Sequence, residues 1–175
     1  MALMQALEYY PGNKPYLMYL YAGFLQQQFD VRSMAGYGRI FRSDDDDKNE
    51  SGPYAVKTLG EDETIAKLAT GIKRFKLPDE YNFIRIFRQT ADEFKKRGGA
   101  EQHLAALAQT FEDRQQYDKA AATWRTLLAD HGAQNSYWKQ RLDQIAGNWG
   151  QLENVSMQPA GIEASVDFRF RNGRK

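Results

Sequence analysis

The sequence predicts an all-α fold of antiparallel helical hairpins, followed by a short C-terminal β-strand. Apolar residues recur at helical spacing along most of the chain, Gly and Pro interrupt these runs, and strict alternation is confined to the C-terminal end. The 175 residues, 42% of them hydrophobic, are enough to bury one sizeable core. The near balance of 24 Lys and Arg with 23 Asp and Glu does not indicate nucleic-acid binding. No run of about 18 apolar residues indicates membrane insertion.

Composition and periodicity divide the chain into four regions. They are N-terminal helices (1–42), an acidic loop (43–60), a helical region (61–149), and a linker with a β-strand (150–175). The loop contains four consecutive aspartates, Asp44 to Asp47, followed by Gly52-Pro53, which is typical of exposed chain. The spacing of its carboxylates does not match the alternating ligands of an EF-hand, so a solvated loop is favoured over a calcium site.

Three runs in the N-terminal region have helical spacing. Leu3, Ala6 and Leu7 indicate a helix that ends before Pro11-Gly12-Asn13. Residues 31–41, after the suitable N-cap Asp30, indicate another. Between them, residues 15–28 predict a helix with one buried apolar stripe, formed by Leu17, Leu20, Tyr21, Phe24 and Leu25.

Helical spacing resumes after the acidic loop. Residues 62–75 predict an amphipathic helix that ends at Leu77-Pro78 and buries Ile65, Leu68, Ala69, Ile72 and Phe75. Pro78-Asp79 opens a further helix, whose expected buried stripe is Phe83, Phe87, Ala91 and Phe94. Gly98 follows three basic residues and is expected to end that helix in the left-handed conformation.

Residues 101–132 have the pattern of two paired helices. Counted from Glu101, the pattern residues are Leu104, Leu107, Ala108, Phe111, Ala120, Trp124, Leu127 and Leu128. This segment resembles the tetratricopeptide repeat, in which small residues let the paired helices approach and large ones fill the space to the next pair. It departs from that repeat at Gly132, where Pro is usual, and at Leu127, where Ala is usual; the alternative is an ordinary helical hairpin. Residues 135–145 are expected to form a further or capping helix.

The C-terminal residues change to a period of two. Ile162, Ala164, Val166, Phe168 and Phe170 alternate with polar residues and predict a half-buried strand. Asn172-Gly173 favours a hairpin turn, yet the sequence stops at Lys175. We therefore expect an unpaired strand, cut just inside a following β domain, with docking of the tail on the helices as the alternative.

Three further segments, together with the repeat, carry a family resemblance. They are residues 38–87 (GRIFRSDDDDKNES to EYNFIRIF), 141–153 (RLDQIAGNWGQLE) and 157–175 (MQPAGIEASVDFRFRNGRK). They resemble the helical region of large bacterial alpha-2-macroglobulin-like proteins, just before a β-sandwich domain. The resemblance implies a scaffold segment of a protease-trapping protein in the bacterial cell envelope or periplasm, or exported. The thioester found in many family members needs a cysteine, which this sequence lacks, so no functional residue carries over.

The concave face of the predicted repeat is the main candidate binding surface. Positions 2, 5, 9 and 12 of its first helix would line that face, namely Gln102, Ala105, Gln109 and Glu112. Because this set has no cation, capture of a peptide carboxylate is not expected. The groove could hold an extended protein segment or pack on a neighbouring domain.

The other polar groups are interpreted as structural. His103 is expected to be exposed, and His131 to sit at a helix end. Asp92-Glu93 and Glu112-Asp113 diverge around their helices and are expected to be solvated. Arg169, Arg171, Arg174 and Lys175 do not share a strand face with Phe168 and Phe170, which argues against nucleic-acid binding.

These patterns favour a non-catalytic helical-repeat scaffold that positions or binds protein within a larger alpha-2-macroglobulin-like polypeptide. No cysteine and only two histidines are present, so we expect no metal, no cofactor and no thiol catalysis. A freestanding adaptor that recruits a peptide is the first alternative, and a small enzyme is the second. Composition leaves the compartment, the oligomeric state and the partner open.

Overall fold

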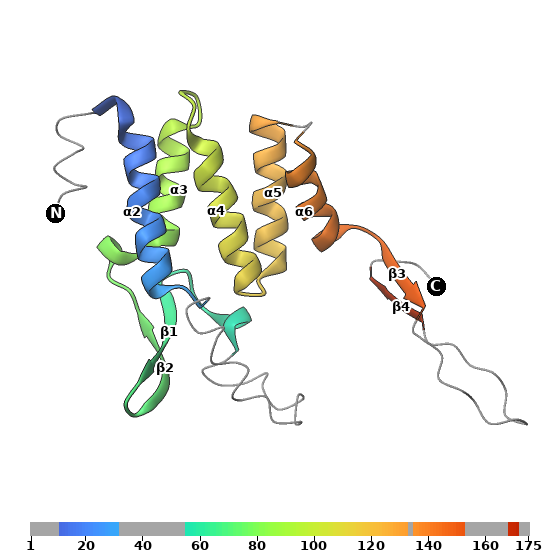
Figure 1. Cartoon of the computed structure of the whole chain (residues 1–175), viewed down its shortest axis with the longest axis horizontal. Coiled ribbons are helices and arrows are strands. Elements are labelled where there is room, and N and C mark those ends of the chain that lie inside the picture. Colours follow the sequence, from blue (N-terminus) through green and yellow to red (C-terminus); the bar gives the residue numbers. More distant parts are fainter. Residues whose placement is uncertain (1–10, 32–54, 133–134, 153–167, 172–175) are drawn as a thin grey trace, which may run out of the picture.

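A computed structural model describes residues 11–31, 55–132, 135–152 and 168–171 as a mostly helical chain with a few short antiparallel strands. The described part contains five α-helices that lie side by side in chain order (Figure 1): α2 (Lys14–Phe29), α3 (Phe83–Phe94), α4 (Ala100–Asp113), α5 (Tyr117–His131) and α6 (Ser136–Ala146). The connections from α3 to α6 are short, so consecutive helices there run antiparallel. No helix among the described residues is long and apolar enough to cross a membrane.

Alternate helices of the array also contact each other. Polar pairs between alternate helices include Gln26 with Thr110 of α2 and α4 (2.9 Å), Gln109 with Tyr137 of α4 and α6 (3.2 Å), and Lys95, just after α3, with Asp130 of α5 (2.7 Å). Helices α2, α4 and α6 therefore form one layer, and α3 and α5 form the other.

The largest core cluster lies between α2, α3 and α4. It includes Leu107 and Phe111 of α4, which are 3% and 1% exposed. The predicted stripe of α3 is confirmed, because Phe83, Phe87, Ala91 and Phe94 are all buried. This helix begins later than Pro78, because the Asn82 side chain accepts the Arg85 N–H at 3.0 Å and caps the first turn. The left-handed conformation expected at Gly98 is also confirmed, with φ of 84°.

The α4–α5 hairpin packs as its sequence predicts. Ala108, Ala120 and Trp124 have no exposed surface, so the small residues do lie between closely packed helices and the indole is in the core. The Trp124 cluster continues to Trp138 and Leu142 of α6. The predicted last helix therefore completes the packing of the hairpin.

The predicted helix over 62–75 is wrong. The segment forms an antiparallel hairpin of β1 (Glu63–Leu68) and β2 (Gly71–Lys76), with Leu68 opposite Gly71. Gly71 adopts φ of 108°, a conformation suited to a turn and unsuited to a helix interior. The β-branched residues Thr64 and Ile65, both buried, favour the strand.

The predicted exposed loop over 43–60 is wrong at its C-terminal end. Residues 55–60 include a 3₁₀ turn, η4 (Val56–Thr58), and bury Ala55 and Leu59 at 6% and 3% exposure. Leu59 packs with Val31 and Ile65 in a second small cluster. The aspartates Asp44 to Asp47, the predicted helix with Leu3, Ala6 and Leu7, and the predicted helix over 31–41 apart from Val31 lie outside the described residues.

Helix α2 matches its predicted span but not its predicted stripe. Leu25 is buried as expected, whereas Leu20 and Phe24 are 39% and 55% exposed. Ala22, at no exposure, lies at the centre of the face that packs on α3. The helix has apolar residues on both sides, so the sequence did not identify which side the core would take.

The C-terminal strand is not unpaired, contrary to the expectation. Its described part, β4 (Phe168–Arg171), pairs antiparallel with β3 (Trp149–Leu152), which directly follows α6 (Figure 1). Phe168 and Phe170 share a face, as the alternation predicts, and their rings stack with centroids 5.9 Å apart. Residues 153–167 and 172–175 lie outside the described part.

Candidate functional site

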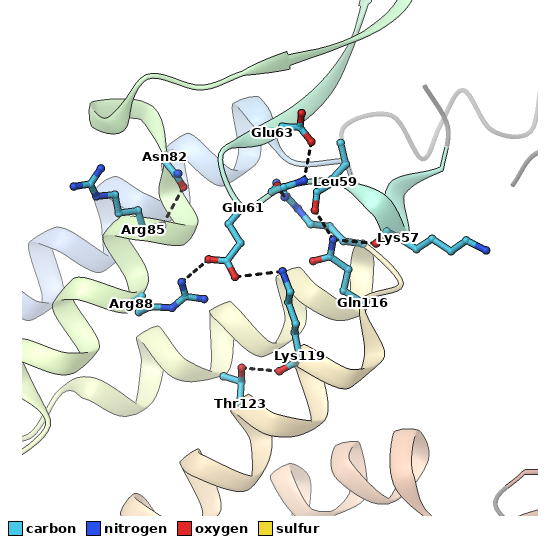
Figure 2. A network of polar contacts seen from close by, with 12 residues as sticks. Lys57, Leu59, Glu61, Glu63, Asn82, Arg85, Arg88, Gln116, Lys119 and Thr123 are labelled. Carbon is cyan, nitrogen blue, oxygen red and sulfur yellow. Dashed lines mark hydrogen bonds and ion pairs between the residues drawn. The ribbon is translucent and has the colours of Figure 1, made fainter. Parts of the chain in front are cut away.

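A network of polar contacts lies where the segment 55–63 passes α3 and the start of α5 (Figure 2). Glu61 is at its centre. One carboxylate oxygen accepts a hydrogen bond from Arg88 of α3, and the other is 3.3 Å from Nζ of Lys119 in α5. The hydrogen bond from Arg88 is the main cause that lowers the pKa of Glu61. The ionised carboxylate therefore links two helices of the same layer.

Arg114, at the C-terminal end of α4, also binds this segment. Its side chain has no exposed surface, and Nη1 donates to the Gly60 carbonyl at 3.0 Å. The guanidinium lies 5.6 Å from the ring centroid of Phe83, and its Nε is 3.7 Å from Oδ1 of Asp30. Burial lowers the pKa of Arg114, and the Asp30 carboxylate opposes that shift. An arginine stays charged even so, because its ordinary pKa is far above neutral pH.

Gln116 completes the attachment from the turn between α4 and α5. Its amide donates to the carbonyl oxygens of Leu59 (2.7 Å) and Lys57 (3.3 Å) (Figure 2). Gln115 before it has φ of 56°, the left-handed conformation that lets this turn reverse in so few residues. The turn of the helical hairpin therefore carries the groups that bind the crossing segment.

The polar groups of this network attach the segment 55–63 to the helices. Its carboxylate already has two cationic neighbours, and its amide and guanidinium groups donate to backbone carbonyls. The described residues contain no group of three or more His, Cys, Asp or Glu side chains that could hold a metal ion. The sequence alone does not reveal this network, because its members come from five separate segments of the chain.

The predicted groove residues lie on α4 but differ in what they contact. Gln102 is exposed, whereas Ala105 is half-buried against the Trp124 cluster. Gln109 donates to the Tyr137 hydroxyl at 3.2 Å. The prediction that they line a binding groove stays a prediction.

Glu112 is not solvated, contrary to the expectation. Its side chain is 11% exposed, accepts the Trp124 indole N–H at 2.6 Å, and pairs with Arg141 of α6. One carboxylate thereby joins α4, α5 and α6. Of the other carboxylates, Asp92 and Glu93 are exposed as expected, and Glu93 pairs with Lys14 at 2.6 Å.

His103 is buried, which corrects the expectation of exposure. It is 1% exposed, and Nε2 lies 2.9 Å from the Pro15 carbonyl, so Nε2 carries the proton in the neutral ring. Tyr19 and Phe87 pack edge-on around it, and Nδ1 has no hydrogen-bond partner among the described residues. Burial is the main cause that lowers the pKa of His103. His131, at the C-terminal end of α5 as expected, lies 3.4 Å from Glu101.

Comparison with known proteins identifies no relative: no family model matches this chain, and neither the curated proteins nor the solved structures gave a match.

Proposed function

We propose that this chain is a non-catalytic scaffold of tetratricopeptide-like helical hairpins that positions or binds protein. The single observation that carries the proposal is the contact between alternate helices, which separates α2, α4 and α6 from α3 and α5. Stacked helical hairpins produce such layers, because the first helices of successive pairs face one side and the second helices face the other. In this interpretation α2 and α3 are one pair, separated in sequence by the segment that carries β1 and β2.

The use of the polar side chains supports a structural role. Glu61, Glu112 and Arg114 each connect separate elements, and the connecting bonds occupy the groups that an acid–base site would need free. The resemblance to the helical region of alpha-2-macroglobulin-like proteins gives the scaffold its proposed place. There, a rigid array would set the spacing of neighbouring domains of the same polypeptide, within a protein that traps proteases.

If the array is rigid, the distance between its first and last described helices should have a single value. The chain has no cysteine, so spin labels can be placed at Gln28→Cys in α2 and Gln140→Cys in α6 without competing thiols. We expect pulsed electron paramagnetic resonance to give one narrow distance distribution across the array. The matched control is Asp118→Cys with Ala129→Cys, two exposed positions about 16 Å apart along α5, which sets the width for a single helix. A distribution across the array that is broad or has two maxima would contradict the scaffold.

A freestanding peptide adaptor is the second candidate, favoured by two exposed groups on the α4–α6 side, Gln102 and Tyr137. The adaptor predicts a stoichiometric peptide partner for the isolated chain, captured from bacterial envelope extract. Capture should then be lost with Gln102→Arg and kept with Ala122→Arg on the opposite layer. The scaffold predicts no stoichiometric partner, because its neighbours are held by covalent linkage.

A further inference from the structure

Helix α2 packs against a buried histidine of α4. His103 is 1% exposed, and its Nε2 lies 2.9 Å from the carbonyl oxygen of Pro15 in the first turn of α2. The ring of Tyr19, one turn further along α2, has its centroid 5.6 Å from that of the imidazole. The ring of Phe87 in α3 lies 5.8 Å away by the same measure. One titratable side chain is therefore enclosed by two other helices, and α2 supplies part of its cover.

The hydrogen bonding of His103 suits the neutral imidazole. A neutral ring with its proton on Nε2 donates to the Pro15 carbonyl, and its Nδ1 has no hydrogen-bond partner among the described residues. A second proton on Nδ1 would add a charge and a donor for which the described residues provide no acceptor. Burial of a charge without compensation is costly. Burial accordingly lowers the pKa of His103, and the bond to Pro15 opposes that shift.

The charged groups at this end of the array pair with one another. Lys14 of α2 pairs with Glu93 of α3 at 2.6 Å, and Glu101 of α4 lies 3.4 Å from His131 of α5. The pKa of His103 is shifted by burial and by the bond to the α2 backbone, and no carboxylate is among the causes within the described part of the chain. The described parts of α2, α3 and α5 therefore supply no countercharge for a protonated ring.

The connectivity of the chain lets α2 separate while the other helices stay packed. Residues 30–82 join α2 to α3, whereas α3, α4, α5 and α6 follow one another through connections of a few residues. The Lys14–Glu93 pair at the start of α2 is 41% and 45% exposed, so it contributes little to the attachment. Local opening of one element costs less free energy than unfolding of the whole chain. Release of α2 would leave His103 on the surface of α4, where water can surround a charged ring.

We propose that α2 is a pH-dependent cover, which packs over His103 while the ring is neutral and separates from α3 and α4 when the ring binds a second proton. The released state binds that proton more readily, because its hydrated imidazole has the ordinary pKa of 6.5. Packing of α2 is therefore complete above this pH and weakens below it, until the pKa of the packed state is passed. Release would expose Phe87 and Leu107, which are now 0% and 3% exposed. The proposal concerns one helix and holds whether or not the array is a scaffold.

Amide hydrogen exchange of the full chain, measured by mass spectrometry, separates release of α2 from unfolding of the whole chain. Peptic fragments that span α2 and α5 are compared at about pH 7.5 and about pH 5.5, after correction for the intrinsic pH dependence of exchange. We expect the corrected rate in α2 to rise several-fold and at most about tenfold, because the lower pH is about one unit below the ordinary pKa of 6.5. Helix α2 should exchange faster than α5 at both pH values.

Two variants assign the response to one histidine. His103→Gln keeps a donor for the Pro15 carbonyl and does not titrate, so the corrected rate in α2 should be the same at both pH values. His131→Gln is the matched control, because His131 lies beside Glu101, between α5 and α4. This second variant should keep the full response of α2.

Three outcomes would overturn the proposal. A rate in α2 that does not rise at the lower pH, or that still rises in His103→Gln, would mean that His103 does not control the packing of α2. Equal protection of α2 and α5 would mean that the chain opens as a whole.

A direct titration replaces the variant if His103→Gln loses its helical circular dichroism. Nuclear magnetic resonance follows the His103 ring in the unchanged chain, and we expect a midpoint below 6.5, whereas a midpoint at 6.5 or above would contradict the proposal. The distances between labels on α2 and α6 are measured at neutral pH, so the scaffold proposal is judged separately.

Discussion

The interior of the α4–α5 hairpin and the junction with segment 55–63 are held together in opposite ways. In the hairpin, Ala108, Trp124 and Leu127 meet in a fully buried apolar cluster. At the junction, directional polar bonds attach the crossing segment to the helices: Arg88 donates to Glu61 of the segment, and Arg114 donates to the Gly60 carbonyl. Apolar burial supplies stability that does not depend on exact geometry, whereas the polar bonds determine where the segment lies. The difference predicts a graded series of effects when each region is altered.

Loss of the Trp124 side chain should have the largest effect. We expect Trp124→Ala to lower the free energy of unfolding by about 3–5 kcal/mol, because it leaves a cavity where three helices meet. Urea titration followed by circular dichroism measures the loss, and Trp124→Phe should lose less. A loss below about 1 kcal/mol would show that the hairpin does not depend on its apolar interior.

Removal of Arg114 should come next, at about 3 kcal/mol. Arg114→Ala removes the cation that faces buried Asp30 and the donor to the Gly60 carbonyl. The same titration measures it, with exposed Arg85→Ala as the matched control. Equal losses for the two variants would mean that the junction is no more dependent on a buried charge than the surface is.

Acid should weaken the α2–α4 contact through His103. Its pKa is lowered in the folded chain, so the unfolded chain binds the proton more readily once the pH falls below the ordinary value of 6.5. Stability is complete above that value and falls as the pH drops, by at most about 1.4 kcal/mol per pH unit until the folded-state pKa is passed. Urea titrations at several pH values test this, and His103→Gln should flatten the slope. An unchanged slope in that variant would assign the pH dependence to other groups.

The smallest effect is expected at Glu61. Its side chain is 31% exposed, so Glu61→Gln should cost less than about 1 kcal/mol. The cost should shrink further at high salt, which screens the pairs with Arg88 and Lys119. Thermal unfolding at two salt concentrations measures it, with exposed Glu80→Gln as the control. A cost that salt does not change would show that Glu61 acts through shape rather than charge.

The sequence predicts what local periodicity and caps determine. The helices over 83–94, 100–113 and 117–131 follow from apolar spacing and from Gly98, and the large residues Phe87, Phe111 and Trp124 of that spacing are buried as predicted. The conformation of residues 63–76 was predicted wrongly. Ile65 and Phe75 fit helical spacing, but Gly71 at the turn and the pairing of β1 with β2 favour a hairpin. Local pattern fails where two conformations share one spacing.

The candidate site was beyond local pattern for a different reason. The neighbours of Glu112 in the sequence predict a side chain exposed to solvent. Its partner Arg141 lies on α6, 29 residues away in the sequence, and pairs with it only in the folded chain. His103 is buried because Pro15 and Tyr19 of α2 and Phe87 of α3 lie around it. The burial of such residues depends on tertiary contacts. The partners in those contacts have no fixed separation in the sequence, so periodicity does not predict them.

The insertion of β1 and β2 between α2 and α3 has a consequence for the order of assembly. Helices α3 to α6 meet through connections of a few residues, whereas α2 must close a loop that runs from residue 30 to residue 82. Loop entropy rises with the logarithm of length, so this closure costs about 2 kcal/mol more than a turn of four residues. Helices α3 to α6 can form a folding nucleus from contacts that are local in the sequence. We expect α2 to pack on this nucleus last during folding and to separate from it first during unfolding.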